Sequence, residues 1–206
     1  MSRPHIFRVI TCGDTEVGKT SIIRRCIYDC FEENKIQTLG MDYNIYDIHL
    51  ENNEIIRLGL VDTAGQERYK SLGKGYFKNA DGALFVFSLN DNETFENMTS
   101  WIKIFEDSNK KKGKIIPKYL IGNKNDLEQE VAEDDIKKFL KDYPEFVYKS
   151  TSAKKDENQI KELIQELGKK IYEVNKGNLN KENKSLKLDG INDDKKCCLC
   201  LINCCL

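Results

Sequence analysis

The chemistry of this chain is first visible in residues 13–20, Gly13-Asp14-Thr15-Glu16-Val17-Gly18-Lys19-Thr20. They fit the pattern G-x-x-x-x-G-K-[ST], in which glycines let the backbone curl around an anion and loop amides point at phosphate oxygens. Lys19 then places a positive charge on the β- and γ-phosphates and is a candidate catalytic residue, while the Thr20 hydroxyl can ligate Mg²⁺. A chance glycine-rich turn is the alternative, but a predicted strand before the loop and a predicted helix after it favour the phosphate site.

A carboxylate at the end of a later predicted strand gives this loop a partner. Asp62 follows the strand predicted over residues 54–61 and opens the segment Asp62-Thr63-Ala64-Gly65-Gln66-Glu67. Such an acid is the expected carboxylate of a nucleotide-bound magnesium site, commonly acting through a water. Gly65 allows a backbone amide to approach the γ-phosphate, and Gln66 is a candidate for orienting the attacking water. Taken alone, Asp62 could equally cap a turn; beside the phosphate loop it predicts hydrolysis of a nucleoside triphosphate.

Two further loops predict which base is bound. Asn123-Lys124-Asn125-Asp126 follows the strand predicted over residues 115–121 and fits N-K-x-D. The Asp126 carboxylate can accept from the N1–H and the 2-amino group of guanine, whereas adenine offers neither donor, so such a site discriminates strongly. The Lys124 stem can lie over the base plane, and the amides of Thr151-Ser152-Ala153-Lys154 can meet the guanine oxygen. A surface Asx turn at residues 123–126 is the alternative.

The elements that must position these loops alternate along the chain. Strands are predicted over residues 7–12, 43–50, 54–61, 83–87, 115–121 and 146–148, with a turn at 52–53 and helices between most of the others. One of these helices is predicted by the apolar spacing from Phe95 to Phe105, and another is predicted to have an acidic first turn, Glu133-Asp134-Asp135. This alternation predicts an α/β fold, a mostly parallel six-stranded sheet flanked by helices. Ligands in such folds bind beyond the carboxyl ends of the strands, where the four motifs lie.

Composition limits the alternatives. The chain has 206 residues, 39% hydrophobic and 33% charged, which suits one soluble domain and a tail, and its net charge of −1 gives no reason to expect a nucleic-acid partner. No run of roughly 18 apolar residues predicts a membrane span, and the first five residues resemble neither a signal peptide nor a myristoylation site. Cys12, Cys26 and Cys30 are predicted to be small core residues of a reduced, cytosolic protein.

Over roughly residues 5 to 175, the motifs in this order and spacing resemble those of the Ras-like small GTPases. The segments Thr38-Leu39-Gly40-Met41-Asp42-Tyr43 and Glu67-Arg68-Tyr69 are similar to the Rab branch, which regulates vesicle traffic. The resemblance implies a single small-GTPase domain over residues 1–175 that cycles between GTP and GDP and hydrolyses GTP slowly. It also implies that residues 31–43 and 62–80 are switches ordered by the γ-phosphate.

The resemblance extends to single residues. Thr38 is expected to bind Mg²⁺ and the γ-phosphate beside Thr20 and Asp62, and Phe31 to stack edgewise on the guanine. The residues expected to contact the nucleotide are Asp14, Thr15, Glu16, Val17, Gly18, Lys19, Thr20, Ser21, Phe31, Thr38, Gly65, Asn123, Lys124, Asp126, Ser152, Ala153 and Lys154.

The expected partners follow from the resemblance: effectors, an exchange factor, a GTPase-activating protein, a Rab escort protein and a GDP-dissociation inhibitor. The protein is expected to be a monomer that cycles between the cytosol and the cytoplasmic face of intracellular membranes. One alternative is a module that holds nucleotide and does not cycle, which Thr38 and Gln66 disfavour. An ATP-using kinase is disfavoured by Asn123-Lys124-Asn125-Asp126.

Two positions depart from the Rab pattern. Val61 stands where Rab proteins usually carry a tryptophan that forms an aromatic effector surface with the positions of Tyr43 and Tyr76. Glu16 is an acid inside the anion-binding loop, and its side chain is expected to turn outward to water.

Residues 176–206 are predicted to be a flexible tail with lipid-bearing cysteines. Asn203 is fourth from the end, so the terminus is not a CaaX box. Cys204-Cys205-Leu206 instead resembles Rab endings that receive two geranylgeranyl groups, which suits stable anchoring. Cys197, Cys198 and Cys200 are candidates for palmitoylation, with a metal knuckle or disulfides as the alternative.

Overall fold

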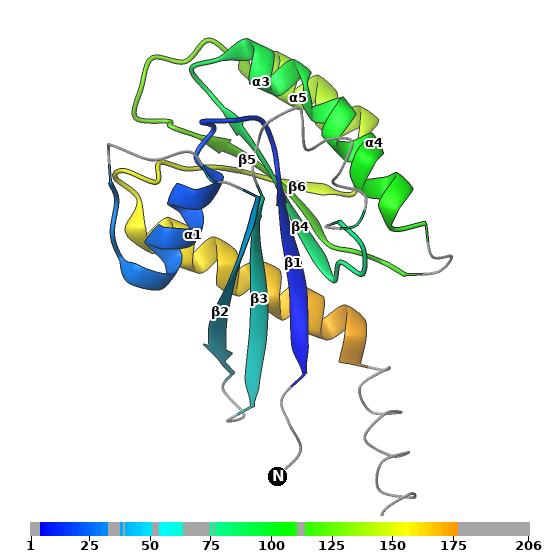
Figure 1. Ribbon diagram of the computed structural model, residues 1–206. Helices are drawn as coiled ribbons and strands as arrows, with labels where there is room; N and C mark the ends of the chain where they lie inside the picture. Colours follow the sequence, from blue (N-terminus) through cyan, green and yellow to red (C-terminus); the bar gives the residue numbers. More distant parts are fainter. Residues whose placement is uncertain are drawn as a thin grey trace, which may run out of the picture. The chain divides into compact units, whose positions relative to one another are not determined.

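The structure is a computed structural model that describes residues 5–32, 38, 40–50, 54–63, 75, 77–110 and 114–176. Within these residues, six strands form one sheet (Figure 1). The strands are β1 (Ile6–Cys12), β2 (Met41–His49), β3 (Ile55–Thr63), β4 (Gly82–Ser88), β5 (Lys118–Asn123) and β6 (Phe146–Ser150). Their order across the sheet is β2-β3-β1-β4-β5-β6. Only β2 and β3 pair in antiparallel fashion, so the predicted mostly parallel six-stranded sheet is confirmed.

Within the described residues, helices lie between several of the strands, and one helix follows the last strand. They are α1 (Lys19–Tyr28), α3 (Asn92–Glu96), α4 (Met98–Ser108), α5 (Glu133–Asp142) and a helix over residues 157–176. The three acidic residues predicted for a first helical turn do occupy the first turn of α5, where the positive end of the helix dipole stabilises their negative charges.

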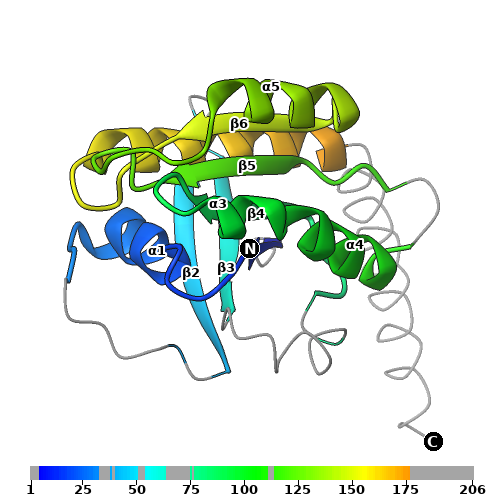
Figure 2. The same ribbon diagram turned by 90° about the horizontal axis from the view of Figure 1, so that it is seen from above.

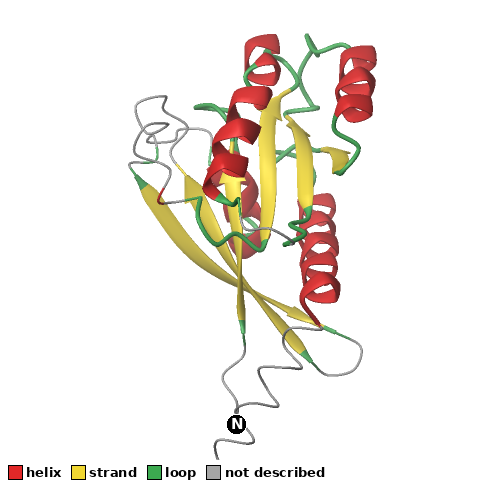
Figure 3. Ribbon diagram, turned by 90° about the vertical axis from the view of Figure 1, so that its right-hand side faces the viewer, coloured by secondary structure: helices red, strands yellow, loops and turns green. Residues whose placement is uncertain are grey.

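Helices cover both faces of the sheet, as Figures 2 and 3 show from two directions. The residues 157–171 lie on one face, since a side chain at Gly168 would collide with Ile48 and would contact Leu58. On the other face, Trp101 and Phe105 of α4 and Phe139 of α5 belong to one buried cluster with the strand residue Phe85. Because both faces are covered, β4 carries seven buried residues in a row rather than an alternating pattern.

Three sequence-based expectations need correction. The strand predicted to begin at Ile115 begins at Lys118: Ile115 is 70% exposed, and Pro117 has no N–H to donate to a ladder. The helix predicted through Phe95 and Phe105 is two helices that meet at Asn97. Cys30 is only half-buried, whereas Cys12 and Cys26 lie in the core as expected.

By its internal contacts the chain divides into two units, residues 1–171 and 172–206. The predicted domain boundary at residue 175 stays a prediction. None of the helices in the described part of the chain is both long and apolar enough to cross a membrane.

Candidate functional site

The phosphate loop connects β1 to α1, and two of its glycines are required by geometry. Gly13 has φ 143° and Gly18 has φ 99°, a region that L side chains rarely adopt. A Cβ at Gly13 would collide with the carbonyl oxygen of Val86, and one at Gly18 with Nδ2 of Asn123. The loop therefore passes too close to β4 and to the Asn123 side chain for any other residue at these positions. Glu16 is exposed, as expected.

Lys19 is held inside this loop. Its ammonium donates to the carbonyl oxygens of Gly13 (2.9 Å) and Asp14 (2.6 Å), and the residue is 5% exposed. Burial lowers the pKa of Lys19 to about 8, although the nearby carboxylate of Asp62 acts in the opposite direction. A buried ammonium beside backbone amides is a site that favours an anion, because an anion would offset the cost of burying the charge.

The three predicted magnesium ligands lie together. Oγ1 of Thr20 lies 2.8 Å from Oγ1 of Thr38 and donates to Oδ2 of Asp62 at 2.6 Å. Asp62 belongs to β3 and is 2% exposed. Two hydroxyls and one carboxylate fit Mg²⁺, which takes few protein oxygen ligands and completes its shell with water and phosphate. No group of three His, Cys, Asp or Glu side chains suited to a metal occurs among the residues that the structure describes.

Asn123 connects the base loops to the phosphate loop. It ends β5 and is 1% exposed. Its Nδ2 donates to the carbonyl oxygen of Val17 at 2.8 Å, and its Oδ1 accepts from the amide of Ala153 at 3.1 Å. The side chain predicted to contact nucleotide is therefore bonded to two other predicted site segments within the protein itself.

Asp126 is oriented by the loop after β6. Oγ of Ser152 donates to Oδ1 of Asp126 at 2.6 Å. Ser152 is 0% exposed, and its own amide donates to Oδ2 of Asp156 at 2.9 Å. A carboxylate held from one side in this way presents a fixed acceptor to a base.

Two residues that build this end of the site carry no functional signal in the sequence. Arg25 of α1 donates from Nε to the carbonyl oxygen of Ala153 (2.9 Å) and from Nη2 to that of Lys154 (3.1 Å). Asp156 accepts from Ser152, as described above. No local pattern marks Arg25, because its partners lie 128 and 129 residues further along the chain.

The remaining candidate residues fall into two groups. Asp14, Thr15, Val17 and Ser21 lie in the phosphate loop and the first turn of α1, and Phe31 and Lys124 are also among the described residues. Their contacts with a nucleotide stay predictions. Gly65, Gln66, Cys204 and Cys205 lie outside the described residues, so their roles stay predictions.

The position that departs from the Rab pattern is covered in the structure. Val61 is 0% exposed, whereas Tyr43, which pairs with it across β2 and β3, is 45% exposed. Tyr76 lies outside the described residues. Val61 therefore adds no exposed area to that surface.

Several known proteins are similar to this chain over most of its length. A family model described as "Ras family" matches residues 8–173. The Ras-related protein Rab-32B of Dictyostelium discoideum is 35% identical over 206 residues, covering 94% of this chain and 78% of that protein. Ras-related protein Rab-7L1 of Homo sapiens is 33% identical over 172 residues, covering 82% of this chain and 84% of that protein. GTP-binding protein YPT52 of Saccharomyces cerevisiae is 29% identical, with 93% and 98% covered.

Proposed function

This chain belongs to the Ras family as a Rab-like small GTPase of membrane traffic that hydrolyses GTP to GDP, and we propose that the loops described above carry that activity. The alternative of a module that holds nucleotide without cycling receives no support from the relatives. The observation that carries the proposal is the contact among Thr20, Thr38 and Asp62 beside the buried Lys19.

The residues divide the work of hydrolysis. Thr20, Thr38 and Asp62 would hold Mg²⁺, and a bound Mg²⁺ supplies positive charge to the β- and γ-phosphates. Lys19 and the loop amides stabilise the negative charge that spreads over the phosphate oxygens as water attacks the γ-phosphorus. Gln66 orients that water. Asp126 accepts from the guanine donors and sets the preference for GTP.

A single-turnover assay of Gln66→Leu tests this mechanism. The variant should bind GTP as the wild type does, since the phosphate contacts remain, and release phosphate about tenfold more slowly or worse, since water positioning is lost. Gln129→Leu is the matched control, because Gln129 is exposed in the loop after β5. Unchanged phosphate release in Gln66→Leu, with the control also unchanged, would remove Gln66 from the mechanism.

The relatives act on intracellular membranes as a family, and Rab proteins in general work with effectors, exchange factors, activating proteins and a GDP-dissociation inhibitor. For this chain we propose in addition a Rab escort protein and a tail over residues 176–206 that is lipidated on Cys204 and Cys205. Two long isoprenoids suit stable anchoring, because each buried CH₂ contributes about 0.8 kcal/mol.

Intact-mass measurement tests the lipid sites. The wild type and a Cys197/Cys198/Cys200→Ser variant should both carry two geranylgeranyl groups. Cys204/Cys205→Ser should carry none and move from the membrane fraction to the cytosol. Geranylgeranyl groups found on Cys197, Cys198 or Cys200 instead would show that Cys204 and Cys205 are not the anchor sites.

A further inference from the structure

The second residue of the phosphate loop is an acid, and its side chain is bound by two donors from elsewhere in the chain. Trp101 donates from Nε1 to Oδ1 of Asp14 at 2.8 Å, and Asn97 donates from Nδ2 to Oδ2 at 2.8 Å. Hydrogen bonds to a charged acceptor are stronger than those between neutral groups. Both carboxylate oxygens of Asp14 are therefore held by side chains that follow it by more than 80 residues.

Both donors lie where α3 meets α4. Asn97 ends α3 and immediately precedes α4, and Trp101 lies in the first turns of α4. The carboxylate of Asp14 is thus held at this junction by two side-chain hydrogen bonds.

The backbone of the same residue belongs to the anion site. The carbonyl oxygen of Asp14 accepts from the Lys19 ammonium at 2.6 Å, while the carboxylate of Asp14 takes the donors of α3 and α4. The ammonium and the carboxylate of one loop are therefore kept on different partners. A carboxylate released from α4 would add a negative charge at the place where phosphates are expected, and like charges in a partly buried site repel.

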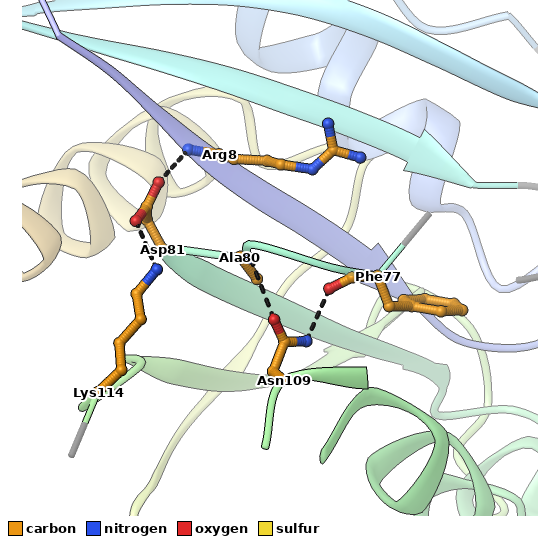
Figure 4. Close-up of polar contacts among 6 residues, drawn as sticks. All are labelled: Arg8, Phe77, Ala80, Asp81, Asn109 and Lys114. Carbon is orange, nitrogen blue, oxygen red and sulfur yellow. Dashed lines mark hydrogen bonds and ion pairs between the residues drawn. The ribbon is translucent and has the colours of Figure 1, made fainter. Parts of the chain in front are cut away.

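Trp101 is itself fixed from its other side. It is 1% exposed, and its ring meets the ring of Phe77 edge to face at 6.3 Å. Figure 4 shows how the far end of α4 holds the same turn: Asn109 donates from Nδ2 to the carbonyl oxygen of Phe77 (2.6 Å) and accepts at Oδ1 from the amide of Ala80 (3.2 Å). The indole therefore has little freedom to follow Asp14 if the carboxylate moves.

We propose that Trp101 and Asn97 are positioning residues that hold the carboxylate of Asp14 against α4 and thereby allow an acid to stand in a phosphate-binding loop. The inference rests on the proposed nucleotide site at that loop. Their loss weakens GTP binding more than GDP binding, because GTP carries one negative charge more. The pair acts through Asp14 and touches no phosphate itself.

Trp101→Phe tests the inference, since it removes the N–H donor and keeps an aromatic ring on Phe77. The dissociation constants of GTP and GDP should rise by about tenfold and by no more than about threefold, respectively, which corresponds to losing one hydrogen bond to a charged group. In an Asp14→Asn background, Trp101→Phe should change the two constants equally, because the charge is gone. Asn97→Ala removes the other donor and should repeat the selective loss.

Phe105→Leu is the matched control for lost volume, because Phe105 is buried on the same helix and packs on Phe85 at 5.5 Å between ring centres. It should lower the thermal midpoint and leave the ratio of GTP to GDP affinity unchanged. Equal loss of GTP and GDP in both Trp101→Phe and Asn97→Ala, or a selective loss that persists in Asp14→Asn, would overturn the inference. A wild-type chain that binds neither nucleotide would overturn the nucleotide site with it.

Discussion

The two ends of the candidate site are built in different ways. At the base end, Asn123 bonds to the backbone of Val17 and Ala153, and Asp126 is held by Ser152, so these side chains are tied to other segments of the protein. At the phosphate end, Thr20, Thr38 and Asp62 bond to one another. The backbone contacts of Asn123 can persist when a base binds, whereas the contacts among Thr20, Thr38 and Asp62 would be replaced by contacts with a metal ion.

This difference separates stability from binding. A change at the base end removes buried hydrogen bonds and costs both folding free energy and nucleotide affinity. A change at the phosphate end removes a ligand whose present partners are other ligands, and it costs mainly affinity. The following variants can sharpen or break that distinction, in order of decreasing effect.

Asp126→Asn should have the largest effect on base choice. The carboxylate offers acceptors only, whereas the amide offers one acceptor and one donor, so GTP affinity should fall about 10³-fold and XTP should bind better than GTP. Competition of XTP against GTP measures this. Asp134→Asn, a change of the same chemistry at a side chain 92% exposed on α5, should change neither. A retained preference for GTP would place the base elsewhere.

Asn123→Ala should affect binding and folding together. Nucleotide affinity should fall about 10²-fold, and the free energy of unfolding should fall by about 2–4 kcal/mol, since the carbonyl of Val17 and the amide of Ala153 lose buried partners. Denaturant unfolding of the nucleotide-free protein measures the second quantity. An unfolding free energy equal to that of the wild type would show that the hydrogen bonds of Asn123 at the base end do not stabilise the fold.

Thr20→Val should reduce binding with little change in folding. GTP affinity should fall about tenfold in Mg²⁺ and match the wild type in EDTA, because only the hydroxyl ligand is lost. The unfolding free energy should fall by only about 1 kcal/mol, because Thr20 is half-buried and water can replace its hydroxyl beside Asp62. Thr99→Val, at an exposed residue of α4, serves as the control. A loss of the same size in EDTA would show that Thr20 does not act through a metal.

The lowered pKa of Lys19 at the phosphate end should make the free energy of unfolding depend on pH. The pKa of Lys19 is about 8 in the folded protein against its ordinary 10.5, so the unfolded chain binds more protons in this range and the free energy of unfolding rises with pH. From about pH 7 to about pH 9 the gain is about 1 kcal/mol in the nucleotide-free protein without metal. Lys19→Met should lose this rise. If the free energy of unfolding of this variant rose with pH as in the wild type, another group would be responsible.

Sequence reasoning reached the fold and the motif residues because both depend on local signals. The phosphate loop, Asp62 and Asn123 each follow an apolar run at a strand's carboxyl end, and alternation of strand and helix brings those ends to one edge. The apolar spacing over residues 95–105 predicts one continuous helix, because it does not reveal that one helix ends at Asn97 before the next begins.

Contacts over long sequence distances were not accessible in this way. The place of Asp14 in the phosphate loop predicts a contact with the nucleotide, but it does not reveal that the Asp14 side chain binds Trp101 and Asn97. Arg25 supports the loop at Ala153 from α1. Such pairings depend on how distant elements pack, and no spacing within one segment encodes them.

The central position of β1 has a consequence for how the chain folds. Its residues pair with β3 from Arg57 onward and with β4 from Gly82 onward, so the first strand to be synthesised waits for partners more than 50 residues away. The β2–β3 hairpin needs only near neighbours and can form first. Its residues Ile48 and Leu58 lie against the helix at Gly168, which is synthesised more than 100 residues later. If synthesis stalls before that helix, the hairpin therefore exposes apolar side chains that can aggregate or bind chaperones.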